Sequence, residues 1–225
     1  MVSRSRPLNI LFDFDGTLSD SLPGIEYSVR AAFAACSRPL RHPNLRPFIG
    51  PPIREILARA GEVVDTADLD RLERAFRHSY DSEGWRMAVC FPGAAEALRE
   101  LRRRGCNLFL VTNKPQHITR AILEQEGLTA LFDEIVTRDS HSPAYPDKEA
   151  MLRAVVLSHK LGSDSCLMVG DTMEDAIAAA SAGIRMVWMA HGYGILSEPQ
   201  PEAVTAVLSG FSQLQKFVAE VPGDD

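Results

Sequence analysis

Short apolar runs alternate with helix-like stretches through the second half of the chain, and this alternation constrains the fold more than any other feature. From Phe91 onward, strands are expected at 107–111, 134–137, 166–169 and 185–189. The helices between them begin at Pro92, Pro115, Lys148 and Asp175, and end near Gly105, Gly127, Leu161 and Ala182. Repeated strand–helix units predict a parallel, doubly wound α/β sheet.

The first half of the chain adds one strand, at Leu8–Phe12, and then a long stretch without a strand-like run. Helices are expected at 23–35, at 51–60 with Gly61 just beyond the helix end, and at 66–79. Asp20 or Ser21 is the expected N-cap of the first of these helices. The chain therefore contains a small helical unit inserted after its first strand.

Two acids, Asp13 and Asp15, stand where the first strand ends, in the sequence Asp-Phe-Asp-Gly-Thr. Alternate side chains of an extended segment point the same way, so the two carboxylates are expected to converge. At about 4 Å, two ionised carboxylates repel by about 4 kcal/mol at an effective dielectric constant near 20. The pair therefore calls for a shared proton or a bound cation, although five residues alone also suit an acidic surface turn.

Other predicted strands also end in chemically capable residues. The strand at 107–111 is followed by Thr112-Asn113-Lys114, and the strand at 166–169 by the segment 170–175, which contains Asp171 and Asp175. Lys148 opens the helix between them. Ligands of open parallel sheets bind beyond the carboxyl ends of the strands, so these residues are expected to share one site.

The ordered motifs DFDGTLSD, VTNK, DK and VGDTMED resemble those of the haloacid dehalogenase superfamily, in the phosphatase branch that carries a helical cap. The likeness covers nearly the whole chain, and phosphoglycolate phosphatase-like members look most similar. It implies a Rossmann-like core at 1–19 and 85–225 with a helical cap domain at 20–84. It also implies a phosphoric monoester hydrolase that acts on a small phosphorylated metabolite.

The chemistry of the acids and the resemblance indicate the same catalytic roles. Asp13 is the candidate nucleophile, which would form an aspartyl-phosphate, and Asp15 is the candidate general acid and base. Asp171 would hold Mg²⁺ together with Asp13, and the resemblance adds the backbone carbonyl of Asp15 as a ligand. Asp175 either orients Lys148 and water molecules around this group or serves only as an acid at a helix N-terminus.

Thr112 and Asn113 are the candidates for binding the phosphoryl group, at the start of a helix. Lys148 is expected to neutralise charge between Asp13 and the phosphate. Many family members have Lys-Pro before this helix, whereas this chain has Asp147-Lys148-Glu149. Lys114 therefore stays open as the alternative phosphate-binding lysine.

Substrate choice is assigned to the cap. Gly50 lies in the tight loop Ile49-Gly50-Pro51-Pro52, and Arg46 and Arg54 are candidates for binding a carboxylate or a second phosphate. The loop 191–194 follows the expected last strand of the core. It resembles a loop at the edge of the family's site, but it also suits a simple turn.

Bulk properties exclude several other functions. A net charge of −6 argues against nucleic-acid and membrane-surface partners, and scattered cysteines without a Cys-x-x-Cys pair favour reduced thiols. No signal peptide or membrane span is expected, so a cytoplasmic protein is the default, with 222–225 as a frayed tail. The alternatives are a phosphomutase, a phospho-accepting receiver module and a binding protein without turnover; the substrate and the oligomeric state stay open.

Overall fold

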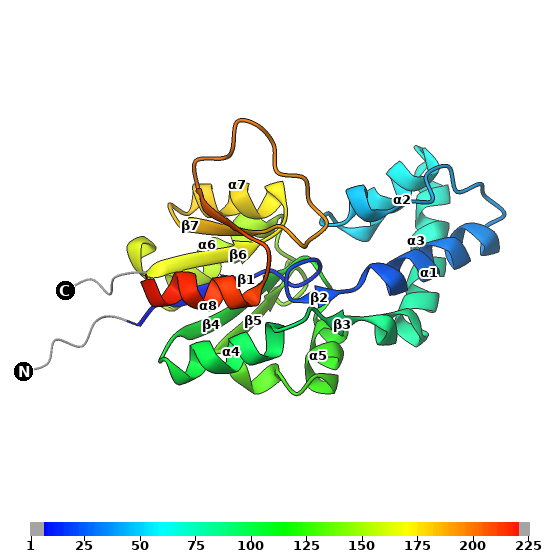
Figure 1. The fold of residues 1–225 in the computed structure, drawn as a ribbon. Coiled ribbons are helices and arrows are strands. Elements are labelled where there is room, and N and C mark those ends of the chain that lie inside the picture. The colour runs from blue at the N-terminus through cyan, green and yellow to red at the C-terminus, as the bar shows by residue number, and fades with distance from the viewer. Residues whose placement is uncertain (1–6, 221–225) are drawn as a thin grey trace, which may run out of the picture.

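Six parallel strands form the central sheet of the computed structural model, which describes residues 7–220 (Figure 1). Their order is β5-β4-β1-β6-β7-β8. The bounds are Asn9–Phe12 for β1, Asn107–Thr112 for β4, Glu134–Thr137 for β5, Cys166–Gly170 for β6, Arg185–Met189 for β7 and Val204–Leu208 for β8. The predicted α/β class is confirmed, whereas the expected tail at 222–225 lies outside the described residues.

Helices cover both faces of this sheet. Ile10 and Phe12 pack on one face with residues of α4 (Ala94–Arg103), α5 (Gln116–Gln125) and α8 (Phe211–Glu220). Leu11 packs on the other face with α6 (Lys148–Ser158) and α7 (Met173–Ser181). Strands buried on both faces read as continuous apolar runs, which is why β1 and β6 are so clear in the sequence.

The sheet extends one strand further than the sequence predicts. Arg185–Met189 was expected to be the last strand, but β8 pairs in parallel with β7, and α8 then packs on α4. Exposed positions alternate along β8, which lies at the sheet edge. It therefore lacks the continuous apolar run that marks the buried strands, and its position depends on pairing with β7.

Three helices lie beyond the carboxyl ends of the strands, at the right of Figure 1. They are α1 (Leu22–Ala35), α2 (Ile53–Gly61) and α3 (Thr66–Ser82), with short 3₁₀ turns at Arg46–Phe48 and Gly84–Met87. The chain enters and leaves this group through an antiparallel ribbon of β2 (Ser19–Asp20) and β3 (Val89–Cys90). The ribbon was not predicted, because two residues carry no periodicity.

Two details of the helix ends differ from expectation. Gly61 is the last residue of α2, and the left-handed residue beyond it is Glu62, with φ of 53°. A Cβ on Gly61 would lie 2.4 Å from the ring of Phe33, so close packing explains this glycine. Ser21 is the N-cap of α1 but makes no side-chain capping bond. The starts of α4, α5 and α7 differ from prediction by one or two residues.

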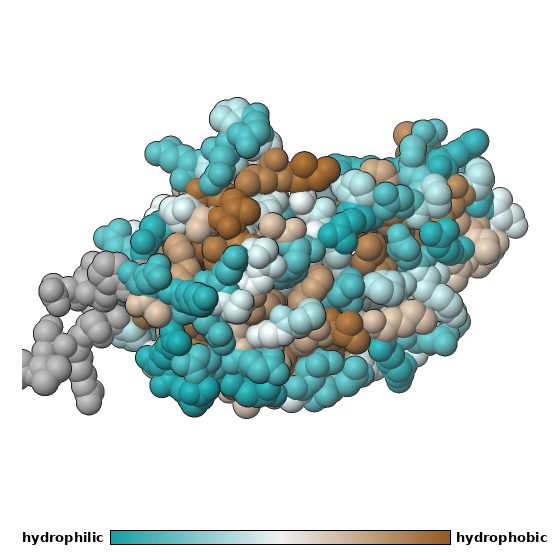
Figure 2. Space-filling model, in the orientation of Figure 1, coloured by the Kyte–Doolittle hydropathy of each residue, from teal (hydrophilic) through white to brown (hydrophobic). Residues whose placement is uncertain are grey.

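Hydrophilic residues cover most of the face shown in Figure 2, and apolar residues are visible between them. Within residues 7–220, no helix is both long enough and apolar enough to cross a membrane.

Gly24→Ala is expected to destabilise the protein. A Cβ on Gly24 would lie 2.0 Å from the carbonyl oxygen of Gly84, so α1 would have to move away from the turn at 84–87. Such overpacking costs roughly 1–3 kcal/mol. Urea unfolding measures the loss. Gly162→Ala is the control, because its added carbon meets only ordinary contacts and should change stability by less than about 0.5 kcal/mol.

Candidate active site

The loop after β1 carries the first two acids. The backbone N–H of Asp13 donates to Val169 O at 2.9 Å, so Asp13 continues the strand pairing to the sheet edge. Phe14 is fully buried in the core, while Asp13 and Asp15 line the same cavity. The alternation expected from extended geometry therefore places both acids at the cavity and the ring between them in the core.

Gly16 lets this loop come close to Asp171. Its φ is +93°, and an added Cβ would lie 2.4 Å from Asp171 Oδ2. The hydroxyl of Thr17 donates to Asp171 Oδ1 at 2.8 Å, and the backbone N–H of Tyr193 donates to Asp171 Oδ2 at 2.7 Å. A Cβ on Gly192 would meet the Asp171 side chain at 2.2 Å. Asp171 is thus enclosed by the loop after β1 and the loop at 191–194. Both loops come so close to its side chain that glycine is needed at the contact points.

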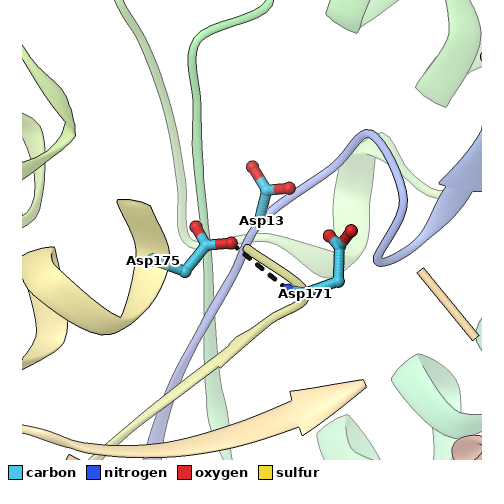
Figure 3. A group of neighbouring side chains, drawn as sticks. All are labelled: Asp13, Asp171 and Asp175. Atoms are coloured by element: carbon cyan, nitrogen blue, oxygen red, sulfur yellow. Dashed lines mark hydrogen bonds between the residues drawn. The ribbon is translucent and has the colours of Figure 1, made fainter. Parts of the chain in front are cut away.

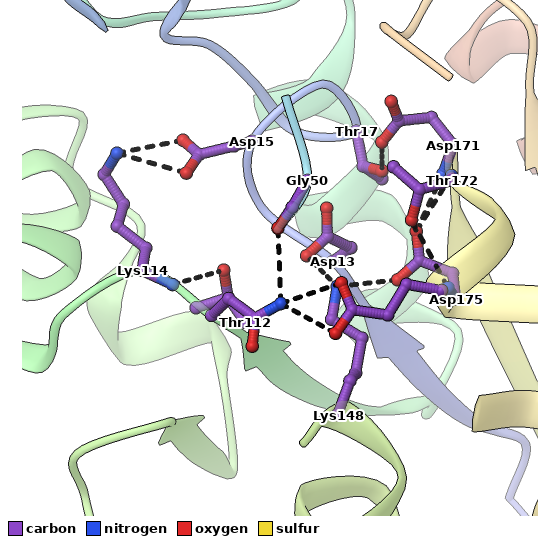
Figure 4. Close-up of polar contacts among 12 residues, drawn as sticks. Asp13, Asp15, Thr17, Gly50, Thr112, Lys114, Lys148, Asp171, Thr172 and Asp175 are labelled. Atoms are coloured by element: carbon purple, nitrogen blue, oxygen red, sulfur yellow. Dashed lines mark hydrogen bonds and ion pairs between the residues drawn. The ribbon is translucent and has the colours of Figure 1, made fainter. Parts of the chain in front are cut away.

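Lys148 lies between two of the acids (Figure 4). Its Nζ lies 2.7 Å from Asp13 Oδ1 and 2.7 Å from Asp175 Oδ1, and all three residues are buried. Lys148 is the first residue of α6, whose N-cap Asp147 accepts the N–H of Ala150 at 2.8 Å. The Asp147 N-cap fixes the start of α6, and this places Lys148 beside the acids at the carboxyl edge of the sheet.

Asp175 both contacts Lys148 and lies at the N-terminus of α7, so its position suits both of the roles considered from the sequence. One oxygen binds Lys148, and the other accepts hydrogen bonds from the backbone N–H groups of Asp171 and Thr172 and from the Thr172 hydroxyl. Thr172 and Asp175 form the capping box that begins α7. A Cβ on Gly170 would lie 2.5 Å from the Asp175 carboxyl carbon, so glycine is needed at this crossing.

Asp13, Asp171 and Asp175 form a buried acidic cluster at the carboxyl edge of β1 and β6 (Figure 3). One carboxylate oxygen of each lies within 4.8 Å of the others. Three carboxylates face the single ammonium of Lys148, which leaves a charge of about two minus when all are ionised. Hard oxygen donors with two excess negative charges fit a divalent cation such as Mg²⁺.

The protonation energetics of the cluster agree with this fit. Burial raises the pKa of Asp13 well above its ordinary value. Burial, with the nearby charge of Asp175, raises the pKa of Asp171 to about 6. Burial disfavours charge on Lys148 too, but Asp13 and Asp175 outweigh that effect and raise the pKa of the lysine. The lysine therefore stays charged, and the acids need a further cation to ionise without a large cost.

Thr112 and Asn113 lie at the carboxyl end of β4, and both line the cavity. The Thr112 hydroxyl accepts the backbone N–H of Lys114 at 3.2 Å. Asn113 Nδ2 donates to both Glu174 carboxylate oxygens at 2.9 Å and to Gly50 O at 3.2 Å. Asn113 Oδ1 is buried and has no hydrogen-bond partner among the described residues. The asparagine thus ties the sheet edge to the loop before α2.

The two candidate lysines contact different acids. Lys114 Nζ lies 3.0 Å from Asp15 Oδ1 and 2.7 Å from the hydroxyl of Tyr80, which belongs to α3. Lys148 instead contacts Asp13. The lysine beside the candidate nucleophile is therefore Lys148, and Lys114 links the candidate general acid to the helices above it.

The structure places Arg46 away from the lining of the cavity. Its guanidinium donates to the backbone carbonyls of His191 and Gly192 and lies 5.3 Å from the centre of the Tyr193 ring. Arg46 is thus held against the loop at 191–194.

Gly50 and Arg54 do line the cavity. Gly50 has φ of +129°, and its carbonyl binds Asn113 as described above. Arg54 donates to Asp70 at 2.6 Å and to Glu73 at 3.3 Å, so its charge is already neutralised by carboxylates of α3.

Sequence reasoning missed the polar partners that lie far from the acids along the chain. Thr17 is inside the first motif, and its contact with Asp171 could have been suspected from that position. The Tyr193 hydroxyl donates to Asp20 and accepts the N–H groups of Ser21 and Leu22. The sequence analysis singled out the loop 191–194, but not these contacts of its tyrosine. Tyr80 lies one residue beyond the helix predicted at 66–79, and nothing in that pattern marks it as a partner of Lys114.

The fold and the site together define a class: an α/β enzyme with a buried carboxylate–lysine centre at the carboxyl edge of a parallel sheet, beneath a group of helices. The family model described as haloacid dehalogenase-like hydrolase matches residues 10–189. The chain therefore belongs to the haloacid dehalogenase-like hydrolase family.

Curated relatives of this chain include phosphoglycolate phosphatases. A phosphoglycolate phosphatase of Cereibacter sphaeroides is 36% identical over 189 residues, covering 82% of this chain and 85% of the relative. A phosphoglycolate phosphatase of Rhodospirillum rubrum is 33% identical over 231 residues, covering 97% and 94%. A solved structure of a predicted phosphoglycolate phosphatase from Haemophilus somnus superposes with a TM-score of 0.83 at 25% identity, covering 96% of this chain and all of that one. The resemblance predicted from the motifs is confirmed.

Proposed function

We propose that this hydrolase cleaves a small organic phosphate monoester, of the phosphoglycolate type, with Mg²⁺ and through an aspartyl-phosphate on Asp13. The observation that carries the proposal is the buried Asp13 carboxylate, 2.7 Å from Lys148 and open to a cavity of about 510 Å³. The names of the curated relatives support the phosphatase activity and the substrate type.

The reaction proceeds in two displacements at phosphorus. A carboxylate oxygen of Asp13 forms a bond to phosphorus, the bond to the ester oxygen breaks, and Asp15 gives a proton to the departing alkoxide. Asp15 then takes a proton from water as the water oxygen attacks phosphorus. The bond to Asp13 breaks, inorganic phosphate leaves, and both acids return to their starting states.

The other residues position these groups. Lys148 keeps the Asp13 oxygen in place and offsets charge on the phosphoryl group, while the Thr112 hydroxyl and the backbone N–H groups at Thr112 and Asn113 bind its oxygens. Lys114 holds the Asp15 carboxyl group at the cavity. Asp13, Asp171 and the backbone carbonyl of Asp15 would hold Mg²⁺. When bound, the ion supplies charge stabilisation for the transferring phosphoryl group.

The helical segment 20–84 would serve as a cap domain. Its helices lie over the carboxyl ends of the strands, and the chain passes to and from it through the β2–β3 ribbon. A cover in this position excludes water and large substrates from the acids. A small phosphorylated metabolite therefore fits the site better than a phosphoprotein or a nucleic acid.

Removal of divalent metal is expected to stop the reaction. Excess EDTA should abolish release of phosphate, and added Mg²⁺ should restore it, because the acid cluster needs a cation to ionise. Ca²⁺ should restore little, since it prefers more ligands and longer bonds. Asp171→Ala should raise the Mg²⁺ concentration needed for half-maximal activity at least tenfold. Full activity in EDTA, with no metal found by elemental analysis, would exclude the metal role.

A panel of phosphorylated metabolites, read by released inorganic phosphate, tests the function itself. Phosphoglycolate should rank among the best substrates. Transfer of phosphate between two sugar positions without release would instead indicate a phosphomutase. A stable phosphoprotein that does not turn over would indicate a phospho-accepting binding protein.

A further inference from the structure

The cavity beside Asp13 has two unlike sides. The floor is polar and consists of residues at the strand ends, including Asp13, Asp15, Thr112 and Asn113. The opposite side is formed by α1–α3 and the loop before α2, and it is largely apolar: Ile25, Ile49, Ile53, Ile56 and Phe76. An anionic group placed against these apolar residues would lose its hydration without gaining a partner, so the charged residues of the lining decide where it can bind.

Most basic residues of the cavity are already paired with an acid. Arg54 binds Asp70 and Glu73, and Arg77 binds Glu73 at 2.9 Å. Lys114 binds Asp15, and His117 lies 3.5 Å from Asp81. The carboxylates of the protein offset most of these charges, so each of these residues is a weaker partner for a second anionic group of a substrate than an unpaired cation would be.

Arg138 is the exception. It lines the cavity, and its side chain has no ion pair or hydrogen bond with the part of the chain that the structure describes, residues 7–220. It follows β5, so it comes from the same carboxyl edge of the sheet as the candidate catalytic acids. The sequence assigned substrate recognition to arginines of the helical segment, whereas the unpaired arginine of the cavity comes from the core.

The backbone around Arg138 is held in place. Its carbonyl accepts the N–H of Tyr145 at 2.9 Å. The neighbouring Asp139 carboxylate accepts the Thr137 hydroxyl at 2.8 Å and the N–H of Gln116, at the start of α5, at 2.9 Å. These bonds hold the backbone from which the Arg138 side chain extends. A ligand therefore has to order only the side chain, which lowers the entropic cost of binding.

We propose that Arg138 binds a second anionic group of the substrate, at the end of the molecule remote from the transferred phosphate. A carboxylate suits the planar fork of a guanidinium because the two can form paired hydrogen bonds. The inference rests on the proposed phosphatase function and assigns a specificity residue to that same site. It specifies the substrate class as phosphate monoesters whose leaving group carries a carboxylate or a similar anion.

Two substrates that differ at one group provide the test. 2-Phosphoglycolate carries a carboxylate where 2-hydroxyethyl phosphate carries a neutral hydroxymethyl group. The wild-type enzyme should prefer phosphoglycolate in kcat/KM. Arg138→Gln should lose roughly 10- to 100-fold on phosphoglycolate, the worth of a hydrogen-bonded ion pair, and change little on hydroxyethyl phosphate. Arg138→Lys should keep part of the preference, because it retains the charge without the fork.

Arg54→Gln is the matched control, since it removes an arginine of the same cavity that is already paired. It should affect both substrates alike. Equal losses of Arg138→Gln on both substrates, or a wild type without preference for the carboxylate, would overturn the proposal.

Calorimetric binding to the Asp13→Asn protein separates this inference from the function on which it rests. Phosphoglycolate should bind at least tenfold more tightly than hydroxyethyl phosphate, and Arg138→Gln should remove the difference. Equal affinities would overturn the role of Arg138 whatever the turnover. A wild type that hydrolyses neither compound, but binds with the expected preference, would refute the phosphatase proposal while keeping the anion site.

Discussion

Asp13→Asn is expected to reduce phosphatase turnover by at least about 10³-fold, because an amide cannot replace the carboxylate as the attacking group. The substitution preserves the shape of the side chain and removes one of three buried negative charges around Lys148, so the protein should stay folded. Steady-state release of inorganic phosphate measures the loss, and mass spectrometry should find no phosphate on the variant after incubation with substrate.

Two companion variants make this result specific. Asp164→Asn changes an exposed aspartate and should leave turnover unaltered. Asp15→Asn should be slow on alkyl phosphates but retain phospho-enzyme formation with an activated aryl ester, whose leaving group needs no proton. Turnover of Asp13→Asn within a factor of ten of the wild type would remove Asp13 from the nucleophile role.

Lys148→Met is expected to damage stability and turnover together. The substitution leaves the carboxylates of Asp13 and Asp175 buried without their shared cation, and breaking a buried ion pair in this way costs about 3–5 kcal/mol. Urea unfolding in EDTA should show the full loss. Turnover should fall by at least about 10²-fold, because charge on the phosphoryl group is no longer offset.

A double variant tests the cause. Lys148→Met combined with Asp175→Asn removes one stranded charge and should regain part of the lost stability, which a double-mutant cycle measures as a coupling energy. Lys216→Met, at an exposed site on α8, should be nearly neutral. A loss of less than about 1 kcal/mol for Lys148→Met would mean that the cluster is not ionised around this lysine.

The sequence was most informative where one physical requirement acts on neighbouring residues. Strands β1 and β6 are buried on both faces, so each reads as an unbroken apolar run, and its end marks the position of Asp13 or Asp171. Lys148 was placed at the start of its helix in the same way, with Asp147 directly before it, although the choice between Lys148 and Lys114 stayed open. Local patterns of this kind predict both the fold and the residues at the edge of the sheet.

Contacts between distant segments could not be predicted in the same way. Whether an arginine of the cavity is free or neutralised depends on carboxylates many positions away, as the pairing of Arg54 with Asp70 shows. Arg46 and Arg138 look alike in the sequence, yet one is bound to the carbonyls of 191–192 and the other faces the cavity. The strand β8 likewise depends on its neighbour β7 more than on its own pattern.

Tyr193 has a consequence for how the helices can move. Its hydroxyl contacts Asp20 and the first N–H groups of α1, replacing the side-chain N-cap that Ser21 does not provide. Its backbone N–H holds Asp171. Tyr193 therefore contacts both the start of the helical segment 20–84 and an acid of the buried cluster. An outward movement of α1 that breaks the contacts of the Tyr193 hydroxyl is therefore expected to weaken the hydrogen bond to Asp171. By linkage, an ion bound at the cluster would then bias the position of α1 to the same extent.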